Sequence, residues 1–184
     1  LSNGTIWAPA GPLSTSATDH ILISRAYPVG TGDEWIELYN PTESSVNVNG
    51  WYINTGDLAG DYKDATLPNS SIAARSYFLI RDAAGDTPAA DYVELVTMAA
   101  SDDYISLHLA DGTTVDAVGF GTAPGLPVGT TTMGTGGNTT AGQMIARKPN
   151  DSNGNGTETN DCAADFLKIT TSTEARNSAS GQLP

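Results

Sequence analysis

At 184 residues and 19.0 kDa, the chain can form one domain with its own hydrophobic core but is short for two. Its 21 acidic and 8 basic side chains give a formal net charge of -13, which repels a phosphate backbone and argues against nucleic acid as a partner. Apolar residues nowhere follow a helical spacing through ten or more residues, and the abundance of Gly and Pro favours short strands joined by turns.

The sequence indicates an exported protein. No apolar stretch is long enough to cross a membrane, and the chain begins at Leu1 rather than Met, so we expect a mature segment that has lost an export signal and lies outside the cell or on its surface. Cys162 is the sole cysteine, which excludes an internal disulfide and leaves a buried thiol or a bridge to another chain. Five Asn-X-Ser/Thr sequons predict glycosylation in a host that glycosylates exported proteins, at Asn3, Asn69, Asn138, Asn150 and Asn155.

Residues 1–18 are predicted to form an extended N-terminal arm, ahead of a folded domain over residues 19–184. This segment contains Pro9 and Pro12 and has no sustained alternation of apolar and polar residues. Its large apolar side chains, Ile6, Trp7 and Leu13, would be better buried than exposed. We therefore expect the arm to pack on its own domain or to contact a neighbour, for example as a donor strand.

Runs of β-branched and aromatic residues that end at turn formers predict strands within residues 20–28, 34–41, 45–54, 71–80 and 91–96, the last as an edge strand. In the second run, alternation places Ile36 and Leu38 on one face and Trp35, Glu37 and Tyr39 on the other. The run at 71–80 ends in four consecutive large apolar residues, which predicts burial on both faces.

Two alternating runs flank the turn dipeptide Asp111-Gly112, so residues 103–121 are predicted to form a hairpin. Its first strand is expected to turn Ile105, Leu107 and Leu109 toward the core, and Tyr104, Ser106 and His108 toward solvent. A long Gly/Thr-rich loop follows, and residues 141–149 and 162–169 are predicted as closing strands. The expected fold is an all-β sandwich of two antiparallel sheets.

One segment resembles a known family. Residues 34–41, EWIELYNP, resemble the E-[FW]-[IV]-E-[LI]-x-N strand of the lamin tail domain, and the segments VNVNGW at 46–51, DYISLHLADGTTVDAV at 103–118, and Arg147, ADF at 164–166 and Asn177 continue the likeness over residues 20–178. This resemblance, to the secreted or surface prokaryotic members, implies an immunoglobulin-like sandwich that serves as a structural or binding module without enzyme activity of its own. The DNA binding of nuclear members transfers poorly to so acidic a chain.

Catalytic motifs are weak throughout. Glu34 and Glu37 could form a catalytic pair, but we favour a structural hydrogen-bond network at these positions. His20 and His108 are the only histidines and have no paired cysteines, so a zinc site has little support. No G-x-S-x-G motif or phosphate-binding loop is present. We therefore do not expect an enzyme.

The best ligand motif is DSNGNG at residues 151–156, which has the D-x-[DN]-x-[DN]-G spacing of a calcium loop. The position that carries a bidentate Glu in the helix-loop-helix version is Cys162 here. The missing carboxylate would have to come from another direction, from Glu158, Asp161 or Asp165, and an ordinary Asn-Gly turn is the alternative. The candidate calcium ligands are Asp151, Asn153, Asn155, Asp161 and Asp165.

Two functions remain open. The first is a non-catalytic extracellular structural module, a subunit of a surface filament or sheath that binds other copies of itself or surface proteins through the arm. The second is an accessory module of a secreted hydrolase that binds polysaccharide or another polymer. An aromatic platform for sugars would come from Trp35, Tyr39, Trp51 and Tyr52, although aromatic side chains in a sandwich are more often core.

Overall fold

The computed structural model describes residues 19–28, 34–57, 60–82, 88–123, 126, 130–149, 156–170 and 175–181. Within these residues the chain is almost entirely β-structure. The strands are β1 (Leu22–Tyr27), β2 (Trp35–Tyr39), β3 (Val46–Asn47), β4 (Tyr52–Asp57), β5 (Gly60–Thr66), β6 (Ser71–Ile72), β7 (Tyr77–Arg81), β8 (Tyr92–Val93), β9 (Tyr104–His108), β10 (Thr114–Gly119), β11 (Met144–Arg147) and β12 (Phe166–Ile169). A 3-10 helix η1 (Thr135–Gly137) and a short helix α1 (Cys162–Asp165) complete the described elements.

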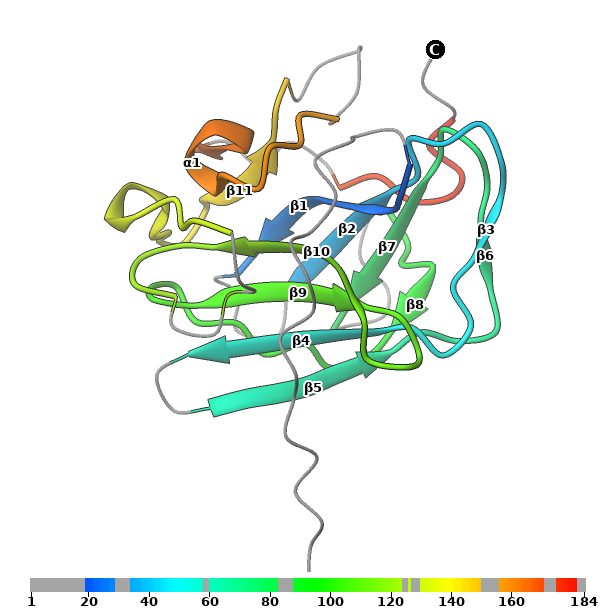
Figure 1. Ribbon diagram of the computed structural model, residues 1–184, viewed down its shortest axis with the longest axis horizontal. Coiled ribbons are helices and arrows are strands. Elements are labelled where there is room, and N and C mark those ends of the chain that lie inside the picture. Colours follow the sequence, from blue (N-terminus) through cyan, green and yellow to red (C-terminus); the bar gives the residue numbers. More distant parts are fainter. Residues whose placement is uncertain are drawn as a thin grey trace, which may run out of the picture.

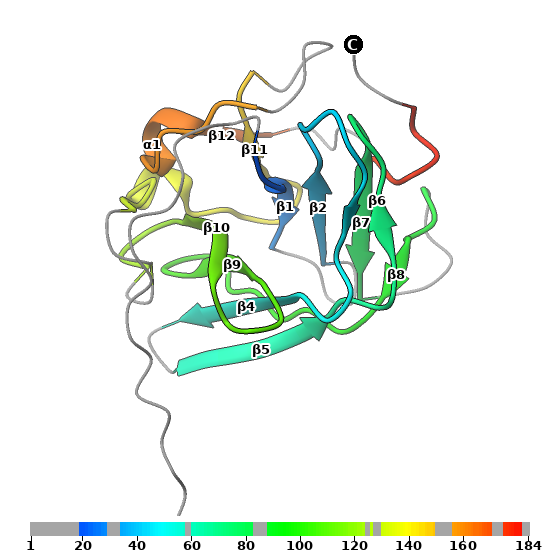
Figure 2. The same cartoon turned by 45° about the vertical axis from the view of Figure 1, so that its right-hand side comes forward.

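Two sheets form the layers of the sandwich (Figures 1 and 2). One has six strands in the order β12-β11-β1-β2-β7-β8, and the other has four in the order β10-β9-β4-β5. All neighbours within them pair antiparallel except β7 and β8, which are parallel. The architecture is an immunoglobulin-like β-sandwich, as the sequence predicts.

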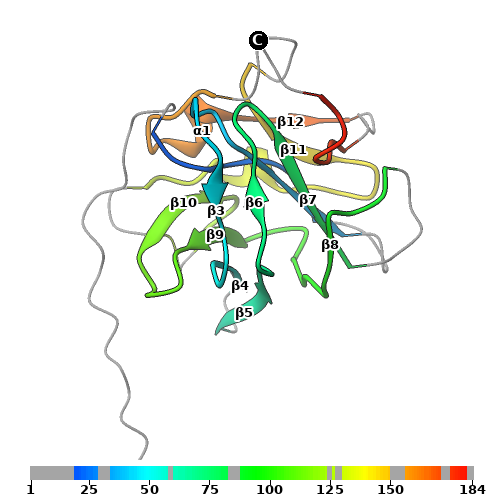
Figure 3. The ribbon, with the colours of Figure 1, turned by 90° about the vertical axis from the view of Figure 1, so that its right-hand side faces the viewer.

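The chain changes sheets twice at one side of the sandwich, and both crossings form a small third sheet (Figure 3). The first crossing, from β2 to β4, contains β3, and the second, from β5 to β7, contains β6. The two pair antiparallel, with Val46 opposite Ile72. The backbone groups of the crossings are therefore satisfied outside the two main sheets.

Apolar side chains from both sheets fill the space between the layers. Ile23 of β1, Ile36 of β2, Ile53 of β4, Leu107 of β9 and Val118 of β10 belong to one cluster and are all 0% exposed. Fully burying an aliphatic side chain of this size contributes about 1.5–3 kcal/mol. Ile36 and Leu38, which share one face of β2, lie in this cluster, and the residues on the other face are buried as well. Every residue of β7 is buried, as the run of four large apolar residues predicts.

Two predicted strands are interrupted in the structure. The run at 45–54 divides into β3 and β4 at Gly50, whose φ of 73° places it in the left-handed region. The run at 71–80 divides into β6 and β7 at Arg75, which has a φ of 56°. These turns allow each run to leave one sheet and enter the next.

The prediction of a solvent-facing side for β9 is wrong. Tyr104, Ser106 and His108 are all buried, because neighbouring groups cover them. His108 stacks on Tyr52 with ring centroids 4.8 Å apart and bonds to the Ser106 hydroxyl. Tyr104 lies over Gly56, where an added Cβ would meet its ring at 2.5 Å. The outward side of this sheet is thus partly closed by its own side chains.

Residues 162–169 do not form one continuous closing strand. Asp161 caps a turn of helix by accepting hydrogen bonds from the amides of Ala163 and Ala164, so residues 162–165 are helical and only Phe166–Ile169 are a strand. Likewise, β5 was not expected from the sequence, because GDYKDAT has no apolar alternation. It becomes a strand through its pairing with β4 at the edge of the four-stranded sheet. The predicted edge strand at 91–96 is shorter, Tyr92–Val93.

Candidate functional site

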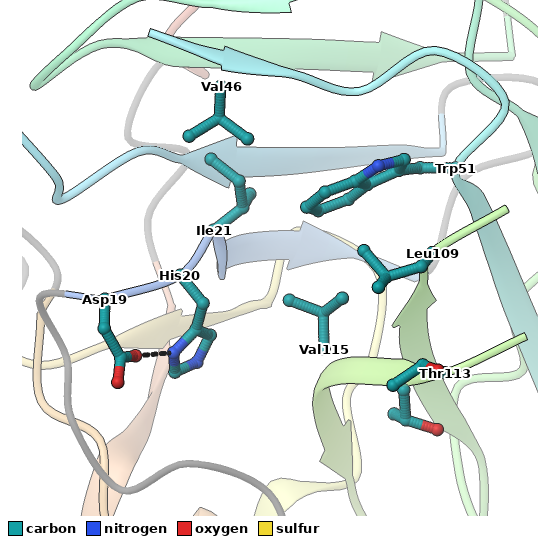
Figure 4. Close-up of a pocket in the computed structure, with 9 residues that line it drawn as sticks. Asp19, His20, Ile21, Val46, Trp51, Leu109, Thr113 and Val115 are labelled. Atoms are coloured by element: carbon teal, nitrogen blue, oxygen red, sulfur yellow. Dashed lines mark hydrogen bonds and ion pairs between the residues drawn. The ribbon is translucent and has the colours of Figure 1, made fainter. Parts of the chain in front are cut away.

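A shallow groove lies where the chain enters the sandwich (Figure 4). Its cavity volume is about 370 Å³. Four separate segments line it: the entry to β1, strand β3, the residue before β4 and the turn of the β9–β10 hairpin. Their lining residues are Asp19, His20, Ile21, Val46, Trp51, Leu109, Thr113, Thr114 and Val115.

The floor and walls of the groove are apolar. Ile21 is fully buried, while Val46, Trp51 and Val115 are partly buried and pack against the main core. The backbone of Trp51 is fixed on both sides, because its amide donates to the Val48 carbonyl at 3.0 Å and its carbonyl accepts from the Leu67 amide at 2.7 Å. The groove is thus a stable surface that offers apolar contact area.

The polar end of the groove is formed by Asp19 and His20 (Figure 4). Asp19 Oδ1 and His20 Nδ1 are 2.5 Å apart, with Asp19 the more exposed partner. The other ring nitrogen, His20 Nε2, is buried and has no hydrogen-bond partner among the described residues. Thr113 is exposed on another segment of the lining. The groove can therefore offer hydrogen bonds as well as apolar contact to an occupant.

The strongest cluster of charges is buried elsewhere and is structural. Arg147 of β11 is 0% exposed and donates to Asp116 Oδ2 at 2.6 Å, to Glu158 Oε2 at 2.5 Å and to the Ile23 carbonyl at 2.8 Å. Its guanidinium also lies over the Phe166 ring, 4.3 Å from the centroid. The network links β1, β10, β11, β12 and the segment before α1.

Two carboxylates, Asp116 and Glu158, share this one guanidinium. Burial, with a further contribution from Asp116, raises the pKa of Glu158 to about 7, although Arg147 acts in the opposite direction. Asp165 is turned away and accepts hydrogen bonds from the Thr159 amide and hydroxyl. Arg147, Asp116 and Glu158 do not line the groove, and the contacts of Arg147 join strands of both sheets.

A second buried network surrounds Glu37, the inner glutamate of the EWIELYNP segment. Glu37 accepts hydrogen bonds from the Ser24 hydroxyl at 2.7 Å and from the backbone amide and guanidinium of Arg176, each at 2.7 Å. The Arg176 guanidinium lies 3.8 Å from the centre of the Tyr77 ring. The C-terminal segment is thereby fixed across β1, β2 and β7.

Glu34 and Glu37 do not form a pair. Glu34 accepts a hydrogen bond from the Met98 amide at 3.1 Å, whereas Glu37 contacts Ser24 and Arg176. Burial, with nearby Asp82, Asp103 and Asp64, raises the pKa of Glu34 to about 7, although the Met98 amide lowers it. The two glutamates therefore belong to separate hydrogen-bond networks.

Of the predicted calcium ligands, Asp161 and Asp165 lie within the described structure, and Asp151, Asn153 and Asn155 lie outside it. Asp161 accepts from the Thr131 hydroxyl and from two amides of α1, and Asp165 is engaged with Thr159. Across the described ranges, no three His, Cys, Asp or Glu side chains come together as a potential metal site. Calcium binding by the loop at residues 151–156 therefore stays a prediction.

The other residues singled out from the sequence also lie partly inside and partly outside the described structure. Asn69 is exposed and Asn138 is partly buried, whereas Asn3, Asn150 and Asn155 are outside the described residues. Ile6, Trp7 and Leu13 of the arm are also outside them. Cys162 is buried, and burial raises the pKa of its thiol to about 12. No helix in the described part of the chain is long and apolar enough to span a membrane.

The proposed aromatic platform is dispersed. Trp35, Tyr39 and Tyr52 are buried, with Tyr39 packed on Tyr77 and Tyr52 on His108. Only Trp51 of the four lines the groove. Sequence reasoning could not assemble this groove, because its lining residues lie up to 96 positions apart, between Asp19 and Val115, and share no motif.

Comparison with known proteins agrees with this architecture. Residues 14–122 match the family model of the Lamin Tail Domain. A crystal structure of a DUF4876 family protein from Bacteroides thetaiotaomicron VPI-5482 has a TM-score of 0.60, over 90% of this chain and 74% of that one, at 13% sequence identity. This second likeness shows the fold alone. No curated protein sequence matches the chain significantly.

The family match ends shortly after β10, but the sandwich does not. Strand β11 pairs with β1, and β12 pairs with β11, so both are integral to the six-stranded sheet. The lamin tail family is a family of non-enzymatic immunoglobulin-like domains, which agrees with charge networks that serve structure. Since the match covers more than half of the sequence, the chain belongs to the lamin tail domain family.

Proposed function

We propose that this protein is a non-catalytic structural module of an extracellular or cell-surface assembly, and that its N-terminal arm makes the contacts between subunits. The single observation that carries the proposal is the use of its buried charges. Arg147, Asp116 and Glu37 all make buried contacts that join strands or segments of the fold. The groove, in contrast, is lined mostly by apolar side chains. A surface of this kind suits binding better than bond-breaking chemistry.

The arm supplies the second half of the argument. Ile6, Trp7 and Leu13 precede the sandwich in the sequence. Covering large apolar side chains of this kind with a partner removes apolar surface from water and so favours association. Other copies of the chain and further surface proteins are the partners we propose. An acidic surface with a net charge of -13 keeps the module dispersed until such a contact forms.

Electron microscopy of the purified native protein tests this proposal. We expect filaments or a sheath from the wild-type chain, and their loss in Trp7→Ser. Leu95→Ser is the matched control, because Leu95 is the most exposed large apolar side chain of the described residues and lies outside the arm. Assemblies of normal length in Trp7→Ser would rule out the arm as the contact.

A second candidate function is that of a glycan-binding accessory module. The presence of Trp51 in the same groove as the Asp19–His20 pair favours it, since sugars are bound by an aromatic face together with hydrogen-bonding side chains. A glycan array probed with the full chain tests this function. Binding that is lost in Trp51→Leu would support it, and an empty array would end it.

A further inference from the structure

The groove of Figure 4 has the size of a binding site and an apolar character. Its volume of about 370 Å³ lies in the range of about 300–1,000 Å³ that is typical of ligand pockets. Val46 and Val115, both partly buried, contribute aliphatic surface, and Trp51 contributes part of an indole ring. An apolar side chain of large size is therefore a better occupant than a charged ligand.

The arm joins the sandwich at this groove. Asp19, the first described residue, directly follows the arm and itself lines the groove. Residues 1–18 contain no Asp, Glu, Lys or Arg, so all 21 acidic side chains lie in the rest of the chain. In a protein with a net charge of -13, the arm is thus an uncharged segment that can approach an acidic sandwich without side-chain repulsion.

The sequence of the arm favours a second copy over its own sandwich as the docking partner. Pro9 and Pro12 fix their own φ angles, and each proline biases the residue before it toward extended backbone. Most of residues 8–12 are therefore biased toward an extended backbone. When fully extended, the chain from Trp7 to Asp19 can span roughly 40 Å at about 3.3 Å per residue, which is long enough for Trp7 to reach a groove on a neighbouring copy.

We propose that the groove binds the Ile6–Trp7 segment of a second copy of this chain. This inference rests on the proposed function and identifies the acceptor for the arm. Trp7 occupies the apolar part against Val46, Trp51 and Val115. Because every copy carries one donor segment in the arm and one acceptor groove, the contact is heterologous. It builds an open polymer unless the copies close into a ring or two copies exchange arms.

Cross-linking between differently marked chains tests the proposal. Two full-length variants, Ala8→Cys beside Trp7 and Thr113→Cys on the exposed rim of the groove, are mixed and treated with a short bismaleimide, with one variant carrying an added mass tag. The natural Cys162 does not interfere, because it is only 2% exposed and burial raises the pKa of its thiol. We expect a mixed dimer of the two variants.

Leu95→Cys is the matched control for Thr113→Cys, because Leu95 is exposed but lies outside the groove. Its yield of mixed dimer with Ala8→Cys should be several-fold lower. Adding Trp7→Ala to the Ala8→Cys chain should reduce the yield with Thr113→Cys to the same level. Equal yields for the two acceptor sites, or a yield that does not depend on Trp7, would overturn the proposal.

The remaining occupants give different results. A dilute chain with both Ala8→Cys and Thr113→Cys that bridges internally, without mixed dimers, would show that the groove holds its own arm and would refute the second copy. Filaments that depend on Trp7 but give no cross-link at Thr113 would refute the groove and leave the proposed function standing. The absence of both filaments and cross-links would refute both.

Discussion

Arg147 of β11 and Asp116 of β10, 31 positions apart, form a buried ion pair of 2.6 Å that ties one sheet of the sandwich to the other. Asp116 Oδ2 also accepts a hydrogen bond from the Ile23 amide at 2.6 Å. Glu158 forms a second ion pair with Arg147, through the other terminal nitrogen of the guanidinium. The pair therefore determines how β1 and β10 sit against each other.

Replacing Arg147 with Met should strongly destabilise the fold. The substitution keeps much of the volume but leaves Asp116 and Glu158 buried without their partner, which costs about 3–5 kcal/mol in the free energy of unfolding. Urea denaturation measures this loss. The control is Arg75→Met, which removes an arginine from the exposed pair with Glu43 and should change stability far less. Equal losses for both variants would contradict the structural role of Arg147.

Glu34 makes the stability depend on pH. Burial raises its pKa from 4.5 to about 7, so the folded state holds more protons than the unfolded state between these values. Its contribution is therefore greatest below pH 4.5 and is lost as the pH rises toward 7. In Glu34→Gln, whose side-chain oxygen can still accept from the Met98 amide, the decline in unfolding free energy over this window should be smaller.

Urea denaturation at several pH values between 4.5 and 7.5 measures this difference. Glu43→Gln is the control, because Glu43 is exposed on the surface, and it should keep the wild-type slope. A Glu34→Gln curve parallel to that of the wild type would show that Glu34 does not titrate in this range.

The close approach of Tyr104 to β4 requires a glycine. A Cβ at position 56 would lie 2.5–2.7 Å from three atoms of the Tyr104 side chain, so Gly56→Ala forces the ring or the strand to move. Overpacking of this kind costs about 1–3 kcal/mol. Gly136→Ala provides the control, because nothing lies within 4 Å of its added methyl group. Thermal unfolding of both variants should show a lower midpoint only for position 56.

The parts of the fold that sequence could predict are those with local signals. Alternation and β-branched residues locate β1, β2, β9 and β10, and the Asp111-Gly112 dipeptide locates the hairpin turn. Strand β5 has no such signal, because its pairing with β4 rather than its composition makes it a strand. The burial of His108 likewise depends on Tyr52, which lies on another strand.

The candidate site was less predictable than the fold. Trp51 was recognised as a possible binding aromatic, but its neighbours in the groove come from three other segments, and nothing in the local sequence indicates that they meet. The networks of Arg147 and Glu37 have the same character, since Glu37 bonds to Arg176 across 139 positions. Long-range polar pairing follows from the topology, which has to be known first.

Calcium binding by the loop at 151–156 would appear as a gain in stability. A ligand that binds only the folded state at 100 times its Kd adds about 2.7 kcal/mol. We expect the thermal midpoint to rise with excess CaCl2 over EDTA, and this rise to vanish in Asp151→Asn. Asp111→Asn, in the hairpin turn, should retain it. An identical midpoint with and without calcium would identify the loop as an ordinary Asn-Gly turn.

Salt should promote assembly rather than oppose it. Two copies that each carry a net charge of -13 repel one another, and the Debye length falls from about 10 Å at 0.1 M to about 3 Å at 1 M ionic strength. The docking of an uncharged Ile6–Trp7 segment on Val46 and Trp51 involves no ion pair that salt could weaken. The yield of the mixed dimer between the Ala8→Cys and Thr113→Cys chains should therefore increase from low to high NaCl. With Trp7→Ala in the donor chain, the yield should stay low at every salt concentration. A yield that decreases with NaCl would mean that ionic contacts, rather than the apolar groove, join the subunits.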